Sequence, residues 1–293
     1  MVCVAGESSR TARYLNLSRA GADDPVIICY EAAGEGTPIL CIPGLGDTGW
    51  IWRKIVPTLT SMHRVIAMEP RGHGRSSSPR GKYALADMAG DIGDIIARLG
   101  LNRPVLIGHG LGARAALLLA IERPRLPGAL ILIASGAAPA AKSVRRGVAE
   151  RIHLAEAGEM HEAYRNRKSE GREPRGMTPR ERAEHHRLFM RGDPSGYASA
   201  GYAELLAPDL TERLNEVSCP ALALTGEEDP EYHEDAQTLS AGIPRCESIL
   251  IEGAGRYAQL DRPEAALALI HEFFRKHQLL VTTSTEENHE PID

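Results

Sequence analysis

The stretch Gly108-His109-Gly110-Leu111-Gly112 decides the fold of this chain. It has three glycines in five residues and stands between an apolar run, residues 104–107, and a run rich in Ala and Leu, residues 111–121. Short apolar runs are typical of strands buried on both faces, and Ala and Leu favour helices. Glycines at alternate positions allow a sharp turn and close packing of a helix on a strand. The stretch therefore predicts strand, turn and helix, with position 110 raised above the sheet.

Alternating strands and helices are predicted along most of the chain. Strands are expected at residues 14–18, 26–31, 38–42, 64–68, 104–107, 129–134, 221–225 and 248–251. Helices are expected at residues 50–59, 85–99, 111–121, 234–240 and 263–276. Such alternation predicts an α/β fold, a mostly parallel eight-stranded sheet with helices on both faces.

One long segment interrupts this alternation. Between Ala137 and Val217 the chain is rich in Arg, Glu, Ala and His and has no strand-like run, so we expect several short helices. We predict a core of residues 1–137 and 218–276 and a helical cap of residues 138–217. The cap is expected over the carboxyl ends of the strands, where open α/β sheets bind ligands. The polar, acidic tail, residues 277–293, and the first dozen residues are expected to be disordered.

The composition is that of an ordinary globular protein. Of 293 residues, 43% are hydrophobic and 25% charged, and the formal net charge is -5, which favours neither nucleic acid nor an anionic membrane as a partner. The chain has neither a leader-like start nor an apolar run near the ~20 residues that span a bilayer, so a cytoplasmic location is expected. Five cysteines, Cys3 among them, lack C-x-x-C spacing, so we expect reduced thiols and neither metal nor cofactor.

Residues 108–112 are called the elbow from here on. Four further segments also follow predicted strands. They are Pro43–Gly46, Glu69–Ser76, Gly226–Pro230 and Gly253–Arg256. With the elbow, they resemble the α/β-hydrolase family over residues 14–276. The resemblance makes them, in order, the oxyanion loop, the D-x-R-G-x-G-x-S loop with Glu for Asp, the acid loop and the G-A-G-H loop. In the predicted cap, residues 191–197 and 208–210 resemble 3-oxoadipate enol-lactonases and their esterase relatives.

The resemblance assigns the catalytic triad to Gly110, Asp229 and Arg256, of which only Asp229 matches. The family uses Ser as nucleophile and His as base. Gly110 has no side chain that could form a covalent intermediate, and Arg256 cannot accept a proton near neutral pH because its pKa exceeds 12. Loss of triad members costs a factor of roughly 10⁴ to 10⁶ in rate.

The two substitutions are chemically complementary. Asp229 would otherwise be a partly buried carboxylate without its partner, and Arg256 can pair with it bidentately. One interpretation is a purely structural ion pair. Another is that Arg256 also presents its guanidinium to an anionic ligand. Misalignment of position 256, or deliberate substitution of both positions, is a third.

Other residues are candidates for binding rather than catalysis. The resemblance makes the backbone amides of Leu45 and Leu111 the oxyanion donors. Trp50 follows the oxyanion loop and either lines the pocket or packs a helix. Ser135 follows the sixth strand and either lines the pocket or caps backbone groups. His233 is either a substitute base or a solvated histidine.

These residues favour a non-hydrolytic protein that binds a small, moderately apolar molecule, such as a carboxylate or carbonyl compound, or a protein partner. One alternative is a lyase, decarboxylase, cyclase or isomerase that uses Arg256 and the oxyanion amides. Another is an ester or lactone hydrolase with an unrecognised nucleophile. The sequence indicates neither the ligand nor the oligomeric state.

Overall fold

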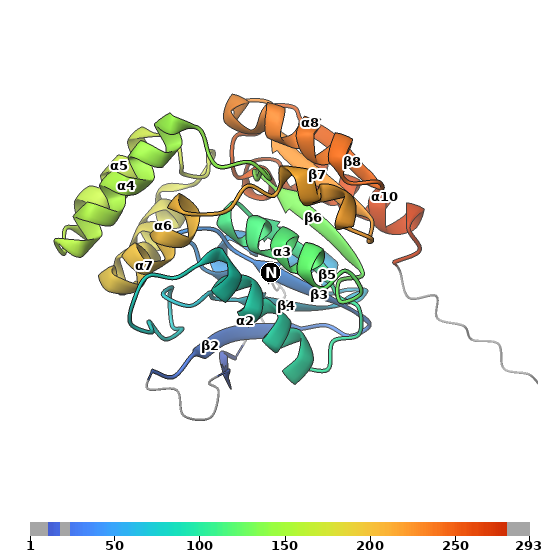
Figure 1. The fold of residues 1–293 in the computed structure, drawn as a ribbon, viewed down its shortest axis with the longest axis horizontal. Coiled ribbons are helices and arrows are strands. Elements are labelled where there is room, and N and C mark those ends of the chain that lie inside the picture. The colour runs from blue at the N-terminus through green and yellow to red at the C-terminus, as the bar shows by residue number, and fades with distance from the viewer. Residues whose placement is uncertain (1–10, 18–23, 280–293) are drawn as a thin grey trace, which may run out of the picture.

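The computed structural model describes residues 11–17 and 24–279, and one sheet of eight strands forms its centre (Figure 1). The strands are β1 Arg13–Asn16, β2 Ile27–Ala33, β3 Thr37–Ile42, β4 His63–Met68, β5 Val105–His109, β6 Ala129–Ile133, β7 Ala221–Gly226 and β8 Cys246–Ile251. Their order is β1-β2-β4-β3-β5-β6-β7-β8. The pairings β1–β2 and β2–β4 are antiparallel and the others are parallel, which confirms the predicted sheet.

Helices cover both faces of the sheet. Those of the core are η1 Gly49–Trp52 (a 3-10 helix), α1 Val56–Leu59, α2 Leu85–Arg98, α3 Leu111–Glu122, η3 Pro230–Tyr232 (3-10), α8 His233–Gly242, α9 Ala258–Asp261 and α10 Pro263–Lys276. Alternate strand residues face opposite layers, as period-2 geometry requires. Leu106 packs with α2, α3 and α8, whereas Val105 and Ile107 pack with η1, α1, α9 and α10.

The helix predicted at residues 50–59 is instead two short pieces, η1 and α1. Pro57 explains the break, because proline lacks an N–H and fits only the first turn of a helix. It is the second residue of α1, so α1 begins one residue before it.

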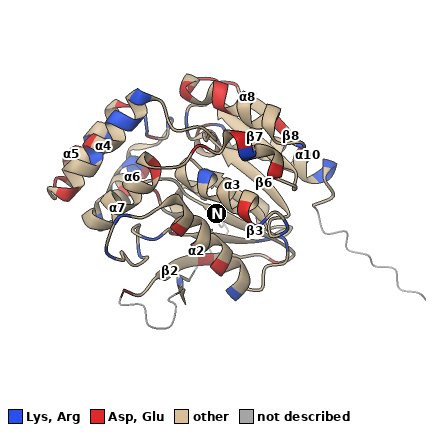
Figure 2. Cartoon of the chain, viewed as in Figure 1, with Lys and Arg blue, Asp and Glu red and all other residues tan. Residues whose placement is uncertain are grey.

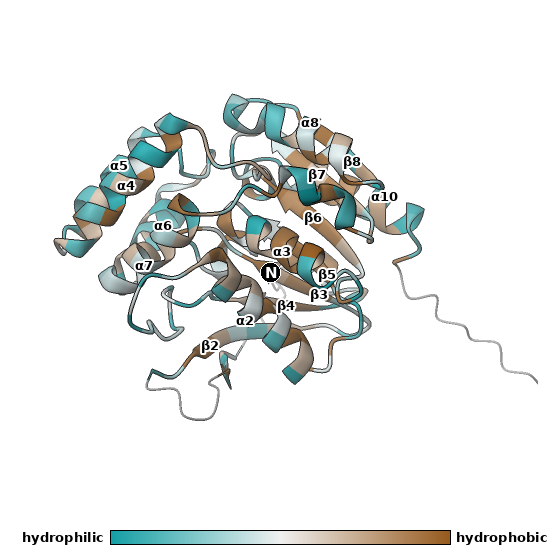
Figure 3. Cartoon of the chain, in the orientation of Figure 1, coloured by the Kyte–Doolittle hydropathy of each residue, from teal (hydrophilic) through white to brown (hydrophobic). Residues whose placement is uncertain are grey.

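A group of helices lies between β6 and β7, where the sequence predicts the cap. They are α4 Lys142–Glu156, α5 Met160–Ser169, α6 Pro179–Met190 and α7 Pro194–Leu205. A small apolar cluster that includes Val148, Phe189 and Tyr197 holds them together. Their other faces are hydrophilic and carry charges of both signs (Figures 2 and 3). The later 3-10 helix η2, Thr211–Glu216, packs instead against α3 and α8 of the core.

The ends of the chain lie mostly outside the described residues. Cys3 and nearly all of the predicted frayed start fall there, and so does the tail from residue 280 onward. Leu279 is described and packs against the core, so ordered structure extends slightly beyond the predicted boundary at 276. Within residues 11–17 and 24–279, no helix is long and apolar enough to cross a bilayer.

Candidate functional site

The elbow joins β5 to α3 and places Gly110 at the first cap position of the helix, with φ 51° and ψ -120°. Its flanking glycines are required by close packing. A Cβ on Gly108 would lie 2.3 Å from the Cα of Ala113, and one on Gly112 would lie 2.4 Å from the backbone oxygens of Ile42 and Pro43. Gly110 is different, because a Cβ added at this position would meet no atom within 4 Å. Open space therefore lies where the family's nucleophile would project.

Arg256 follows β8 and reaches the acid loop after β7. Its Nη2 lies 3.4 Å from Asp229 Oδ1 and only 2.7 Å from Glu231 Oε2. Arg256 therefore does not form the expected bidentate pair with Asp229. It makes one long contact with Asp229 and a shorter one with Glu231, which lies two residues further along the chain in η3. Burial disfavours the charged guanidinium, but Tyr232, Asp229 and Glu231 outweigh it and raise the pKa of Arg256 above its usual value.

Asp229 keeps one free oxygen. Its Oδ2 is buried and has no hydrogen-bond partner within the described part of the chain. Asp229 does not itself line the cavity beside the elbow, whereas Arg256 does. A carboxylate therefore occupies the acid position, but Arg256 rather than Asp229 faces the cavity.

The oxyanion loop is held in place by a buried histidine. The Gly46 N–H donates to Nε2 of His73 at 2.8 Å, and Nδ1 of His73 lies 2.9 Å from the Arg71 carbonyl. Burial lowers the pKa of His73, so the ring is neutral and can accept at Nε2. Leu45 and Leu111 both line the elbow cavity, and neither N–H has an acceptor among the described residues. Both predicted oxyanion amides are therefore unengaged.

A buried polar network links the cap to the oxyanion loop. Arg167 Nη2 of α5 lies 2.5 Å from Asp47 Oδ1 and also donates to the Tyr257 hydroxyl, which donates to Asp47 Oδ2 at 2.9 Å. The ring of His109 stacks on Tyr257 with centroids 4.4 Å apart. Desolvation lowers the pKa of His109 to about 4, so this histidine is neutral near pH 7. The sequence analysis did not predict this network, for which the position of Asp47 directly after the oxyanion loop is the one local signal.

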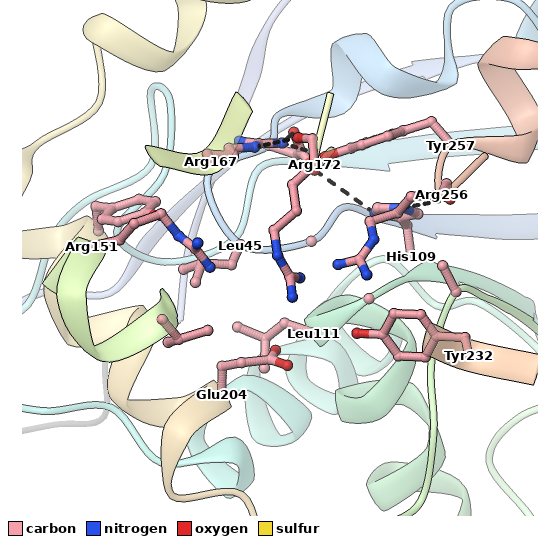
Figure 4. Close-up of a pocket in the computed structure, with 16 residues that line it drawn as sticks. Leu45, His109, Leu111, Arg151, Arg167, Arg172, Glu204, Tyr232, Arg256 and Tyr257 are labelled. Carbon is pink, nitrogen blue, oxygen red and sulfur yellow. Dashed lines mark hydrogen bonds and ion pairs between the residues drawn. The ribbon is translucent and has the colours of Figure 1, made fainter. Parts of the chain in front are cut away.

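The cavity above the elbow, called the elbow cavity from here on, has a volume of about 50 Å³ (Figure 4). The core contributes Gly44, Leu45, Asp47, His109, Gly110, Leu111, Ala134, Tyr232, Arg256 and Tyr257 to its lining, and the cap contributes Val148, Arg151, Arg167, Arg172, Tyr197 and Glu204. Arg172, from the loop between α5 and α6, reaches into the middle of this space. The cap residues were not predicted, because an irregular charged segment does not show which of its side chains point inward.

Three predicted binding residues lie elsewhere. Trp50 borders a second cavity of about 360 Å³ and carries the guanidinium of Arg53 3.5 Å above its ring. Ser135 is buried directly after Ala134 but does not line the elbow cavity. His233 begins α8, and its Nε2 lies 3.1 Å from the Gly226 carbonyl. Packing against Arg53 thus holds Trp50 outside the elbow cavity, and a contact with a backbone carbonyl holds His233 outside it.

No cluster of three or more His, Cys, Asp or Glu side chains is placed to hold a metal within the part of the chain that the structure describes. Three of the described cysteines are free thiols, Cys29, Cys219 and Cys246, and Cys41 is buried within β3. Burial raises the pKa of Cys219 to about 11 and that of Cys246 to about 12. These thiols are therefore poor nucleophiles at neutral pH.

With the elbow, the acid loop and the cap in place, the class of the protein is defined. The chain belongs to the alpha/beta hydrolase family, whose model matches residues 39–269. Human epoxide hydrolase 4 is 35% identical over 135 residues, which cover 45% of this chain and 36% of that protein. Mycobacterial relatives are 36% identical over 107 residues, 36% of this chain and 31% of their own length. The matches thus span about a third of these relatives.

Solved structures share the fold over nearly the whole chain. A thermophilic esterase from Thermogutta terrifontis, with malate bound, superposes with a TM-score of 0.80 at 24% identity, covering 90% of this chain and 99% of its own. The enol-lactonase from Burkholderia xenovorans LB400 gives a TM-score of 0.76 at 23% identity, with 85% and 97% covered. At this identity the likeness shows the fold alone.

Proposed function

We propose that this chain is a non-hydrolytic member of the α/β-hydrolase family that binds a small molecule in the elbow cavity. The observation that carries the proposal is the pair Gly110 and Arg256. Glycine stands at the elbow with open space above it, and a buried, carboxylate-paired guanidinium stands at the position of the base. Acyl transfer needs a nucleophile and a proton acceptor at these two places.

No hydroxyl, thiol or imidazole among the described residues of the elbow cavity is suited to replace the missing pair. Its lining, as far as residues 11–17 and 24–279 form it, contains no Ser, Thr or Cys. Among the lining hydroxyls, burial raises the pKa values of Tyr232 and Tyr257. His109 is the one histidine among the described lining residues, and its low pKa makes it a weak base. A hydrolase with a substitute nucleophile therefore has little support.

The repurposed-enzyme alternative is also weakened. It requires Arg256 to stabilise charge that develops on a substrate. Arg256 already has Asp229 and Glu231 as partners, and its guanidinium lies 4.8 Å from the centre of the Tyr232 ring. The unengaged amides of Leu45 and Leu111 remain, and they favour a ligand with a carbonyl or carboxylate oxygen.

The size of the elbow cavity limits the ligand. About 50 Å³ is well below the roughly 300–1,000 Å³ of pockets for drug-sized molecules. Four arginines in the lining also make the cavity more polar than a site for a moderately apolar molecule. We therefore expect a compact, polar ligand of only a few heavy atoms.

The proposal is tested by assaying the unmodified chain on p-nitrophenyl acetate. We expect turnover roughly 10⁴ to 10⁶ below that of an esterase with an intact triad. Native mass spectrometry of the purified protein is expected to show a small bound adduct that unfolding releases. Turnover comparable with that of active esterases, and abolished by substitution of a residue in the elbow cavity, would overturn the proposal.

A further inference from the structure

The arginines of the elbow cavity are already neutralised. Each has a carboxylate within ion-pair distance: Arg151 with Glu170, Arg167 with Asp47 at 2.5 Å, Arg172 with Glu231 at 3.1 Å, and Arg256 with Glu231 at 2.7 Å. Two of these links share Glu231. Arg172 also contacts Glu170 at 2.9 Å, so positive and negative groups alternate from Arg151 to Asp229. A ligand carboxylate would have to compete with these ion pairs for each guanidinium charge, although Nη1 of Arg167 is buried without a hydrogen-bond partner among the described residues.

Glu204 is the exception in the elbow cavity. It lies on α7, is half-buried and lines the cavity, yet its side-chain carboxylate has no hydrogen bond or ion pair among residues 11–17 and 24–279. The neighbouring cation Arg114 donates its Nη2 to the carbonyls of Ala137 and Pro208 instead. The carboxylate oxygens of Glu204 are therefore available to accept a hydrogen bond from a bound group. The charged side chain of this cavity that lacks an ion-pair partner among the described residues is therefore negative. This argues against the interpretation that Arg256 presents its guanidinium to an anionic ligand.

Other unengaged groups surround the same space. Figure 4 shows the carboxylate of Glu204 beside Leu111, with the Tyr232 hydroxyl pointing into the cavity from the opposite side. That hydroxyl has no hydrogen-bond partner within the described residues, and the N–H groups of Leu45 and Leu111 have none. The cavity thus offers backbone donors for an oxygen and a carboxylate acceptor for an N–H group.

We propose that the ligand of the elbow cavity carries both an amino group and a carbonyl or carboxylate oxygen, with its amino group bound by Glu204 and its oxygen by the amides of Leu45 and Leu111. The inference rests on the proposed function, because it assigns a ligand class to that same cavity. A charged amino group would complete the ion pairing that Glu204 lacks, and charge-assisted hydrogen bonds are the strong ones. A compact zwitterion also fits a volume of about 50 Å³.

The test compares β-alanine with butyrate, which has a methyl group where β-alanine has its ammonium. Dissociation constants are measured at pH 7 by NMR titration of the full chain, following the amides of Gly110 and Leu111. We expect β-alanine to bind about tenfold more tightly than butyrate, as expected for one charge-assisted hydrogen bond. Glu204→Gln is expected to remove this preference by weakening β-alanine about tenfold and changing butyrate less than twofold.

Glu212→Gln is the matched control, because Glu212 is exposed, lies in η2 and does not line the cavity. It is expected to leave both dissociation constants unchanged. The inference is overturned if butyrate binds as tightly as β-alanine, if the preference persists in Glu204→Gln, or if neither compound shifts the elbow amides at 100 mM. None of these outcomes touches the non-hydrolytic proposal, which fails only on ester turnover by the unmodified chain.

Discussion

Replacing Gly110 and Arg256 together, as Gly110→Ser with Arg256→His, should create an esterase. The structure limits the cost in stability. The new Cβ meets no atom within 4 Å, so the penalty at position 110 is the strain of an L residue at φ 51°, about 1–3 kcal/mol. Loss of the guanidinium breaks buried contacts, but Glu231 keeps Arg172 at 3.1 Å. We expect a total loss of about 2–5 kcal/mol in the free energy of unfolding.

The gain in activity depends on groups that are already in place. Asp229 Oδ2 is buried without a partner and is available to an imidazole N–H, and the Leu45 and Leu111 amides are unengaged. With p-nitrophenyl acetate at pH 8, the double variant should turn over at least about 100-fold faster than the unmodified chain, a fraction of the roughly 10⁴-fold or greater triad effect. Either single variant should stay near the unmodified rate, since the two groups act as a unit.

Urea unfolding followed by circular dichroism checks that each variant is folded before its activity is judged. Adding Asp229→Asn to the double variant should lower its rate at least about tenfold, because the carboxylate orients the imidazole. A folded double variant no faster than the single variants would refute the reasoning. It would mean that the amides or the acid loop no longer have the geometry of a catalytic site.

Two further predictions concern the buried network. Arg167→Ala leaves the Asp47 carboxylate buried without its cation and should lower the free energy of unfolding, measured in urea, by about 3–5 kcal/mol. The control Arg213→Ala, in a pair 44% exposed on each side, should leave the free energy of unfolding nearly unchanged. Equal effects of the two substitutions would contradict this account. Because the pKa of His109 is lowered to about 4 and is roughly 6.5 in the unfolded chain, the unfolded state binds more protons between those values. The free energy of unfolding should therefore fall by about 3 kcal/mol from pH 6.5 to pH 4. His109→Gln should make the free energy of unfolding, measured in urea, depend less on pH over this range. An unchanged slope in the variant would be evidence against a buried neutral ring.

Much of the core could be predicted because its signals are local. Three glycines between an apolar run and an Ala-rich run determine the elbow, and the packing at Gly108 and Gly112 shows why. The positions of Asp229 and Arg256 follow from strand ends that lie at one edge of a parallel sheet. Their pairing was anticipated only in part, because the rotamer that brings Arg256 closer to Glu231 depends on the three-dimensional packing of the acid loop.

The cap could be located but not interpreted from sequence. Its helices carry charges on most faces, so periodicity does not separate an inward Arg172 or Glu204 from a solvated side chain. The same ambiguity affected Trp50, whose proximity to the oxyanion loop along the chain did not bring it into the elbow cavity. Contacts between segments distant in sequence, such as Asp47 with Arg167, leave no periodic signal in either segment.

The ion pair between Asp47 and Arg167 has a kinetic consequence. Lifting α5 from the core would separate two charges whose side chains are only 1% and 3% exposed, before water could solvate them. Swinging Arg172 aside breaks only contacts with Glu170 and Glu231, both of which reach solvent. The elbow cavity should therefore open more readily by motion of the Arg172 side chain in the α5–α6 loop than by movement of the whole cap.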